Sequence, residues 1–242
     1  MHPLLSACLL VLLPVCTVMA QSRAPNHRVS NIPLWQVAGG YGTHGVPLGD
    51  HNGDGFADYA VAAPGSGVPA GTAGPGVVYL HSGRTGQIFR QYGGEASGTR
   101  FGEAICDPGD VNTDGIPDLI VSAIDFDAGS PNTGRIYAFS GFDGSVLWTK
   151  DGDPGSGNLG KALVTAGDID NDGALDIVAG ETAYSVGLTG RGRVVMISGR
   201  TGVTRGTADG PVGFGSLGVA LAGRSGSVYA GDAQGRVYVV GP

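Results

Sequence analysis

The residues best suited to chemistry in this sequence are acidic and amide side chains at alternate positions of three short segments. The first segment is GDHNGDGFAD over residues 49–58, the second is GDVNTDGIPD over 109–118, and the third is GDIDNDGALD over 167–176. Together they hold 10 of the 21 acidic residues of the chain and contain no lysine or arginine. Carboxylates gathered this closely repel one another, so each segment predicts either a polar turn or a site for a cation.

Calcium is the cation that such a segment fits best, because Ca²⁺ takes six to eight oxygen ligands and accepts irregular geometry. Positions 1, 3, 5 and 9 of each loop offer side-chain oxygens, position 7 offers a backbone carbonyl, and a glycine at position 6 permits the bend. The predicted ligands are Asp50, Asn52, Asp54, Phe56 and Asp58 in loop one, Asp110, Asn112, Asp114, Ile116 and Asp118 in loop two, and Asp168, Asp170, Asp172, Ala174 and Asp176 in loop three. We therefore expect three calcium ions, with the tightest binding at loop three because it alone has four carboxylates. Three solvated turns are the alternative.

The three loops belong to a longer internal repeat with a period of about 58 residues. Each loop is preceded at a fixed distance by Tyr41-Gly42, Phe101-Gly102 or Leu159-Gly160, and is followed by a strand-like run and the turn SGRTG or SGFDG. In the second unit we predict strands over 103–107, 118–124, 134–140 and 145–150. The 46 glycines fit many tight turns, and four short strands per unit predict an all-β fold, a β-propeller of four-stranded blades.

The Phe-Gly pair, the Asp-x-Asn-x-Asp-Gly-x-x-Asp loop and the run VAAP over 61–64 resemble the FG-GAP repeat of integrin α-subunit propellers. The resemblance covers residues 41–242 and implies the same calcium ligands, including the aspartate at the ninth position. The sequence departs from the family pattern where Leu159 and Leu217 replace the aromatic residue, and where AAP, SAI and AGE replace Gly-Ala-Pro.

The repeat divides the propeller into units of about 41–100, 101–158, 159–216 and 217–242, which makes about four blades. The last unit has Arg224 at the place of the first aspartate and too few residues for a metal loop. It also stops before a fourth strand. NIPLWQV over 31–37 resembles GSVLWTK over 144–150, so this N-terminal strand would complete the last blade; an open or dimerising partial propeller is the alternative.

The N-terminus predicts an exported protein. Residues 4–15 are almost wholly apolar and small residues follow, so we expect a signal peptide over 1–20 and an N-terminal segment over 21–40. An uncleaved anchor and a lipoprotein are the alternatives. Cleavage leaves Cys106 as a single cysteine, which we expect to be a buried apolar residue. A net charge of −7 with two lysines argues against nucleic acid and anionic membranes as partners.

These features favour a secreted or cell-surface adhesion module that binds an extracellular protein or glycan and is not an enzyme. A propeller-type hydrolase or lyase and a fragment of a larger FG-GAP protein are the alternatives. Catalysis would need a pair of carboxylates outside the loops. The candidates show no recognisable pairing in the sequence; they are Glu103, Glu181, Asp125, Asp127 and Asp232. The histidines share no repeat position, so we expect scattered surface residues; they are His27, His44, His51 and His81.

Overall fold

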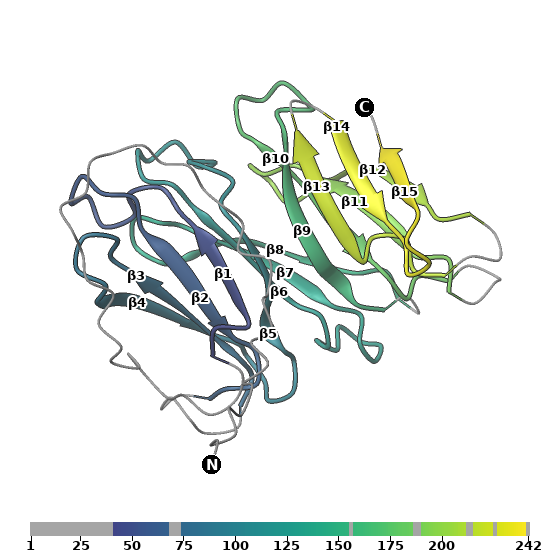
Figure 1. Cartoon of the computed structure of the whole chain (residues 1–242), viewed down its shortest axis with the longest axis horizontal. Coiled ribbons are helices and arrows are strands. Elements are labelled where there is room, and N and C mark those ends of the chain that lie inside the picture. The colour runs from purple at the N-terminus through teal and green to yellow at the C-terminus, as the bar shows by residue number, and fades with distance from the viewer. Residues whose placement is uncertain are drawn as a thin grey trace, which may run out of the picture. The chain divides into compact units, whose positions relative to one another are not determined.

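The computed structural model describes residues 41–67, 74–154, 157–185, 190–211, 215–224 and 227–240. The expected signal peptide over 1–20, the segment 21–40 and the expected strand over 31–37 lie outside the described residues. Within the described part, the regular elements are all β-strands, and they form four antiparallel sheets. Neighbours in sequence are neighbours in each sheet, as Figure 1 shows.

Three sheets have four strands and one has three. The first contains β1 (His44–Pro47), β2 (Tyr59–Ala63), β3 (Val77–His81) and β4 (Ile88–Gly93). The second contains β5 (Phe101–Cys106), β6 (Leu119–Ala123), β7 (Arg135–Phe139) and β8 (Val146–Asp151). The third contains β9 (Leu159–Gly167), β10 (Asp176–Glu181), β11 (Arg193–Ile197) and β12 (Thr204–Asp209). The fourth contains β13 (Ala220–Arg224), β14 (Ser227–Gly231) and β15 (Val237–Val240).

The strands of the second sheet lie within two residues of the positions predicted from the repeat. Their side chains alternate between two faces, because each strand residue points opposite to its neighbour. Ile120, Ile136 and Ala138 therefore share a face that packs on the third sheet, while Leu119, Val121 and Tyr137 share a face that packs on the first sheet. Such stacked four-stranded sheets are the blades of a β-propeller, and the all-β prediction is confirmed.

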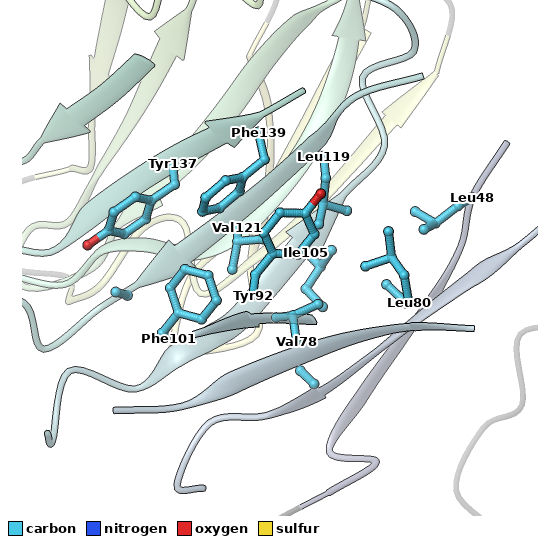
Figure 2. Packing of buried hydrophobic residues seen from close by; sticks show 13 residues of the cluster. Leu48, Val78, Leu80, Tyr92, Phe101, Ile105, Leu119, Val121, Tyr137 and Phe139 are labelled. Atoms are coloured by element: carbon cyan, nitrogen blue, oxygen red, sulfur yellow. The ribbon is translucent and has the colours of Figure 1, made fainter. Parts of the chain in front are cut away.

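The core consists of apolar clusters between consecutive sheets. Between the first two sheets, 13 buried residues interlock, with Val78 and Leu80 from β3 facing Leu119 and Val121 from β6 (Figure 2). Phe101 is fully buried among them, with its ring 5.4 Å from that of Tyr137. Two further clusters join the second sheet to the third and the third to the fourth. The residues that open the second, third and fourth repeat units are thus core residues; Phe101, Leu159 and Leu217 are 0%, 1% and 3% exposed.

The first strand of every sheet lines one shared pocket of about 470 Å³. Glu103 on β5 and Lys161 on β9 meet in this lining, with the Lys161 Nζ 2.5 Å from the Glu103 Oε1. The acidic loops connect these inner strands to the second strands, between β1 and β2, β5 and β6, and β9 and β10. Rigid strands therefore hold both ends of each loop.

Candidate metal centres

Backbone hydrogen bonds close the first two loops at their base, two in loop one and one in loop two. In loop one the Leu48 N–H donates to the Asp58 carbonyl at 2.9 Å, and the Asp58 N–H donates to the Gly49 carbonyl at 3.0 Å. In loop two the Asp118 N–H donates to the Gly109 carbonyl at 2.9 Å. The first and ninth residues are thereby placed beside each other, and the residues between them must curl over that base.

The first-position aspartate accepts the backbone N–H groups that this curl turns inward. In loop two, Asp110 accepts the N–H of Asp114 at 3.1 Å and that of Gly115 at 2.8 Å, one on each carboxylate oxygen. Asp50 and Asp168 accept the equivalent pairs in the other two loops. A carboxylate has about four acceptor sites, so each of these oxygens retains one for a cation.

Glycine at the sixth position has the backbone conformation that the sequence predicted for it. The φ angles are +85° at Gly55, +95° at Gly115 and +89° at Gly173. Residues other than glycine rarely adopt this left-handed region. The bend brings the seventh residue back, so that the N–H of Phe56, Ile116 or Ala174 donates to the fifth-position aspartate at 3.0, 2.9 and 2.9 Å.

The ninth-position aspartate is the most buried acidic residue of each loop. Asp58, Asp118 and Asp176 are 3%, 0% and 1% exposed. One oxygen of Asp118 accepts the Val111 N–H at 2.8 Å, and the other accepts the Gly141 N–H at 3.0 Å. Burial raises the pKa of the Asp118 carboxyl, and that of Asp176, although these N–H donors oppose the effect.

The Ser-Gly pair of each later turn completes the site, and sequence analysis assigned it only to a turn. Gly141 bonds to Asp118 as described, and the Ser140 hydroxyl donates to the Asp114 carboxylate at 3.1 Å. Ser82 and Ser198 make the equivalent bonds to Asp54 and Asp172. The Ser-Gly pair recurs after every loop, with the serine 26 to 28 positions after the fifth-position aspartate, and this recurrence is the signal that could have revealed its role.

Loop three brings three carboxylates together. One oxygen from each of Asp168, Asp170 and Asp176 lies within 4.8 Å of the others, a spacing that a single cation can bridge. Arg205 on β12 lies 2.6 Å from the Asp170 carboxylate, and Arg200 lies 3.6 Å from that of Asp172. The fourth carboxylate, which loops one and two replace with an asparagine, therefore has a guanidinium partner that the loop sequence did not reveal.

The fourth sheet has no comparable loop among its described residues. Arg224, the last residue of β13, pairs in the sheet with Ser227, the first residue of β14. Only two residues lie between them. The nine residues of an acidic loop therefore have no counterpart between β13 and β14.

Two histidines expected at the surface are buried, so that expectation was wrong for them. His51 is 4% exposed because the side chain at the second position of the loop points toward the neighbouring sheet. Val111 holds the same position in loop two and is 0% exposed. Its Nε2 lies 4.0 Å from the Asp107 carboxylate. His81 stacks on Tyr59 with ring centroids 4.9 Å apart. His44 is exposed as expected, and His27 lies outside the described residues. Cys106 is buried on β5, as predicted.

Four of the five carboxylates outside the loops that were candidates for catalysis lie near cations, and the fifth, Asp127, accepts the Asn132 N–H at 2.7 Å. Glu103 contacts Lys161 and also Arg100, whose Nη2 lies 2.6 Å away. Glu181 lies 3.7 Å from Arg193, and Asp232 lies 2.7 Å from Arg236. Burial raises the pKa of Asp125, although the nearby Arg100 opposes the effect. A general acid would need a carboxyl free of such ion pairs, since opposite charges favour the ionised form.

Comparison with known proteins agrees with this geometry. Residues 110–179, which include loops two and three, match the FG-GAP-like repeat family. The chain is 31% identical over 167 residues to integrin alpha-PS2 of Drosophila melanogaster, covering 64% of this chain and 11% of the relative. It is 30% identical over 119 residues to integrin alpha-V of Gallus gallus, covering 46% and 11% of the two chains. With integrin alpha-8 of Gallus gallus the identity is 28% over 170 residues, covering 66% and 15%.

The chain therefore spans a small part of each of these relatives. Among solved structures, the computationally designed Ika4 protein aligns with a TM-score of 0.45 at 15% identity, covering 76% of this chain and 84% of Ika4. The repeat match includes loops two and three and the strands between them. Residues 110–179 thus match the FG-GAP-like repeat family, and the chain is similar to part of integrin α-subunits.

Proposed function

We propose that this protein is a calcium-stabilised, non-catalytic extracellular module that binds a protein or glycan partner. The observation that carries the proposal is the common hydrogen-bond scaffold of the three acidic loops, which leaves carboxylate acceptor sites free at each centre. Each loop would hold one Ca²⁺ through the side chains at positions 1, 3, 5 and 9 and the carbonyl at position 7. The ion would neutralise the charge that the loop concentrates.

The sequence features and the proposed metal support an extracellular location. Residues 1–20 would be cleaved as a signal peptide, residues 21–40 would precede the propeller, and 41–242 would form its four units. Calcium at millimolar concentration outside cells would fill sites of moderate affinity. In the described part of the chain, no helix is long and apolar enough to cross a bilayer.

Recognition would use the loops at the other ends of the strands. There, a pocket of about 540 Å³ lies between the β4–β5 connection and the β6–β7 connection. Its lining includes Glu95, Asp125, Asp127 and Asn132, whose oxygens would suit a partner rich in hydroxyl, amide or cationic groups. The ion pairs on Glu103 and Glu181 favour this binding role over the activity of a hydrolase or lyase.

Calcium loading is tested by titration calorimetry and bound-metal analysis of the chelator-stripped protein. We expect three ions per chain, and two for Asp172→Ala, with a loss of about one third of the calcium-dependent stability, roughly 1.4 kcal/mol. Asp127→Ala is the control for the ion count, because Asp127 lies in the β6–β7 connection, at the opposite end of the sheet from the acidic loop. Fewer than three ions in the parent protein, or an unchanged count in Asp172→Ala, would refute the assignment.

Partner binding is tested with a glycan array and an extracellular-protein array, each probed with calcium and with chelator. We expect binding that Asp127→Lys abolishes while leaving the calcium count at three. Turnover of polysaccharide or phosphodiester substrates would instead support the enzyme class.

A further inference from the structure

Loop one contains the only Asn-Gly step of the sequence, Asn52-Gly53. Loops two and three have Thr113 and Asn171 at the position of Gly53. An asparagine before glycine is chemically labile, because no side chain on the next residue hinders attack of the backbone nitrogen on the amide carbon. Among the three acidic loops, loop one is therefore the one whose third residue can readily lose its amide.

Neither the backbone conformation nor the available space requires glycine at position 53. The φ angle is +72° at Gly53, and Thr113 and Asn171 adopt the same left-handed conformation at +64° and +58°. A Cβ on Gly53 would meet no atom within 4 Å apart from its chain neighbours. The other two loops thus show that a residue with a side chain fits here. The effect of glycine in loop one is to leave the Asn52 amide uncovered.

The atoms that would react are accessible and lie close together. Asn52 and Gly53 are both exposed. The Asn52 Oδ1 accepts the Asp54 N–H at 2.9 Å, so the side chain curves over the peptide that carries the Gly53 nitrogen. In the described part of the chain no hydrogen bond engages the Gly53 N–H. The Asn52 amide nitrogen makes one long contact, at 3.3 Å, with an Asp58 carboxylate oxygen.

We propose that Asn52 is a site of spontaneous deamidation in the calcium-free protein, and that calcium in loop one protects it. The protection rests on the proposed function. In the reaction the Gly53 nitrogen loses its proton to hydroxide and forms a bond to the Asn52 Cγ. The bond from Cγ to Nδ2 breaks, and the amide nitrogen takes up a proton and leaves as ammonia. Water then opens the cyclic imide at either carbonyl, which gives aspartate or isoaspartate.

Protection follows from the place of the reacting amide among the proposed ligands. The Asn52 Oδ1 would be the third-position ligand, and ring closure requires the same amide group to turn toward the Gly53 nitrogen. An ion that binds Oδ1 opposes this turn. The reaction therefore runs from the empty loop, whose share is about one in eleven when calcium is at ten times its dissociation constant.

Opening of the ring to aspartate gives loop one a fourth carboxylate, as loop three has in Asp170. In loop three the Arg205 guanidinium lies 2.6 Å from this carboxylate. By register, Phe89 holds the position of Arg205 in the first sheet, so no guanidinium stands there to offset the new charge. The empty loop is then more repulsive than before the reaction.

Opening to isoaspartate changes the main chain itself. This product adds one carbon to the backbone between the third and fourth positions of the loop. The N–H groups of Asp54 and Gly55, which Asp50 accepts at 3.1 and 2.8 Å, are then out of register with that carboxylate. Because the ammonia is lost, neither product reverts, and prolonged calcium loss from loop one becomes a permanent change.

The proposal is tested by incubating the full chain at mildly alkaline pH with calcium or with chelator, followed by peptide mass spectrometry. In chelator, Asn52 should convert at least about tenfold faster than Asn112, which precedes Thr113. Calcium should slow the conversion of Asn52 about tenfold, in line with the share of empty loop. Gly53→Thr installs the residue of loop two, so it should lower the rate in chelator to that of Asn112 and leave the calcium count at three.

A matched pair of variants separates calcium in loop one from the stability of the whole protein. Asp54→Ala and Asp172→Ala remove the fifth-position carboxylate of loop one and of loop three. With calcium present, Asn52 should convert in Asp54→Ala as fast as in the chelated parent, and should stay protected in Asp172→Ala, although each variant lacks one ion. Equal conversion in the two variants would overturn the proposal, because protection would then come from overall stability.

Two other results would also overturn it. Conversion of Asn52 in chelator no faster than that of Asn112 would show that Asn52 is not a labile site. Equal rates with and without calcium would show that there is no protection. Calorimetry on the same samples tells this failure from that of the proposed function: three bound ions would leave the calcium assignment intact, whereas no bound ion would refute it as well.

Discussion

At the scale of single residues, loop three has an additional carboxylate, Asp170, and this carboxylate has a guanidinium partner. Asp170 stands where loops one and two have Asn52 and Asn112, and Arg205 lies 2.6 Å from it. By register, Arg205 occupies the position of Leu147 in the second sheet and Phe89 in the first. The added negative charge therefore comes with an added positive charge, and Arg200, 3.6 Å from the Asp172 carboxylate, contributes another. The expected tighter binding at loop three depends on whether Arg205 competes with the ion.

Replacing Arg205 should release that extra affinity. In Arg205→Leu, which installs the residue found at the equivalent position of the second sheet, calcium affinity at loop three should rise about tenfold. A unit charge within a few ångströms of a partly exposed site changes the binding free energy by at least about 1.4 kcal/mol. Calorimetry should show a higher calcium affinity at one of the three sites and unchanged affinity at the other two. Arg205→Lys retains the charge and should leave the affinity near its original value; an equal rise in both variants would show that the charge is irrelevant.

At the scale of elements, each acidic loop and the Ser-Gly turn of the same sheet form one unit. The turn lies beside the loop because both occur at the same end of the sheet. A Cβ on Gly141 would lie 1.7 Å from the Pro117 carbonyl oxygen, and Gly83 and Gly199 meet the corresponding carbonyls at 1.8 and 2.0 Å. Only glycine lets the turn approach closely enough for its N–H to reach the buried aspartate.

Gly141→Ala should therefore damage loop two from outside the loop. The methyl group must push the turn away, which breaks the bond from the Gly141 N–H to Asp118 and leaves a buried carboxylate short of a donor. We expect a loss of about 2–3 kcal/mol of unfolding free energy, measured by urea denaturation, together with weaker calcium binding at one site. Gly45→Ala is the matched control, because its nearest neighbour would be the Ala60 carbonyl oxygen at 3.8 Å, an ordinary contact. Similar losses in both variants would mean that the close approach does not matter.

At the scale of the whole molecule, stability comes from apolar clusters between consecutive sheets and, under the proposed function, from calcium. No disulfide can form within the described part of the chain, where Cys106 is the only cysteine and is buried. Three ions bound at about ten times their dissociation constant would add roughly 4 kcal/mol, a large share of a typical total of about 5–15 kcal/mol. Metal would therefore substitute for covalent cross-links.

Chelation should lower the melting temperature by roughly 10 °C at neutral pH, as measured by calorimetry. This calcium effect should also disappear on acidification, beginning above the ordinary aspartate pKa of about 3.9, because burial raises the pKa of Asp118 and Asp176 and protons then compete with the ion. In the metal-free protein the pH dependence of stability has the opposite sign. A carboxyl whose pKa is raised in the folded state stabilises the fold at low pH, and this contribution is lost as the pH rises through the folded pKa. A melt indifferent to chelator would contradict the calcium proposal, and a calcium effect that persists at pH 3 would contradict the role of these two carboxylates.

The sequence by itself determined the repeat, the strand positions and the loops, because these depend on local preferences: alternating side chains, glycine at a left-handed bend, and oxygen ligands two residues apart. It therefore located the second sheet to within two residues and gave Gly55, Gly115 and Gly173 their conformation. Only the tertiary structure decided which distant groups reach each loop. The Ser140 hydroxyl and the Arg205 guanidinium lie 26 and 35 positions after the carboxylates that they contact, and sheet packing brings them there. The same packing buries His51, since the second position of a loop faces the neighbouring sheet whatever residue occupies it. Whether a polar side chain is buried depends on the residues that pack around it, and those residues come from other repeat units.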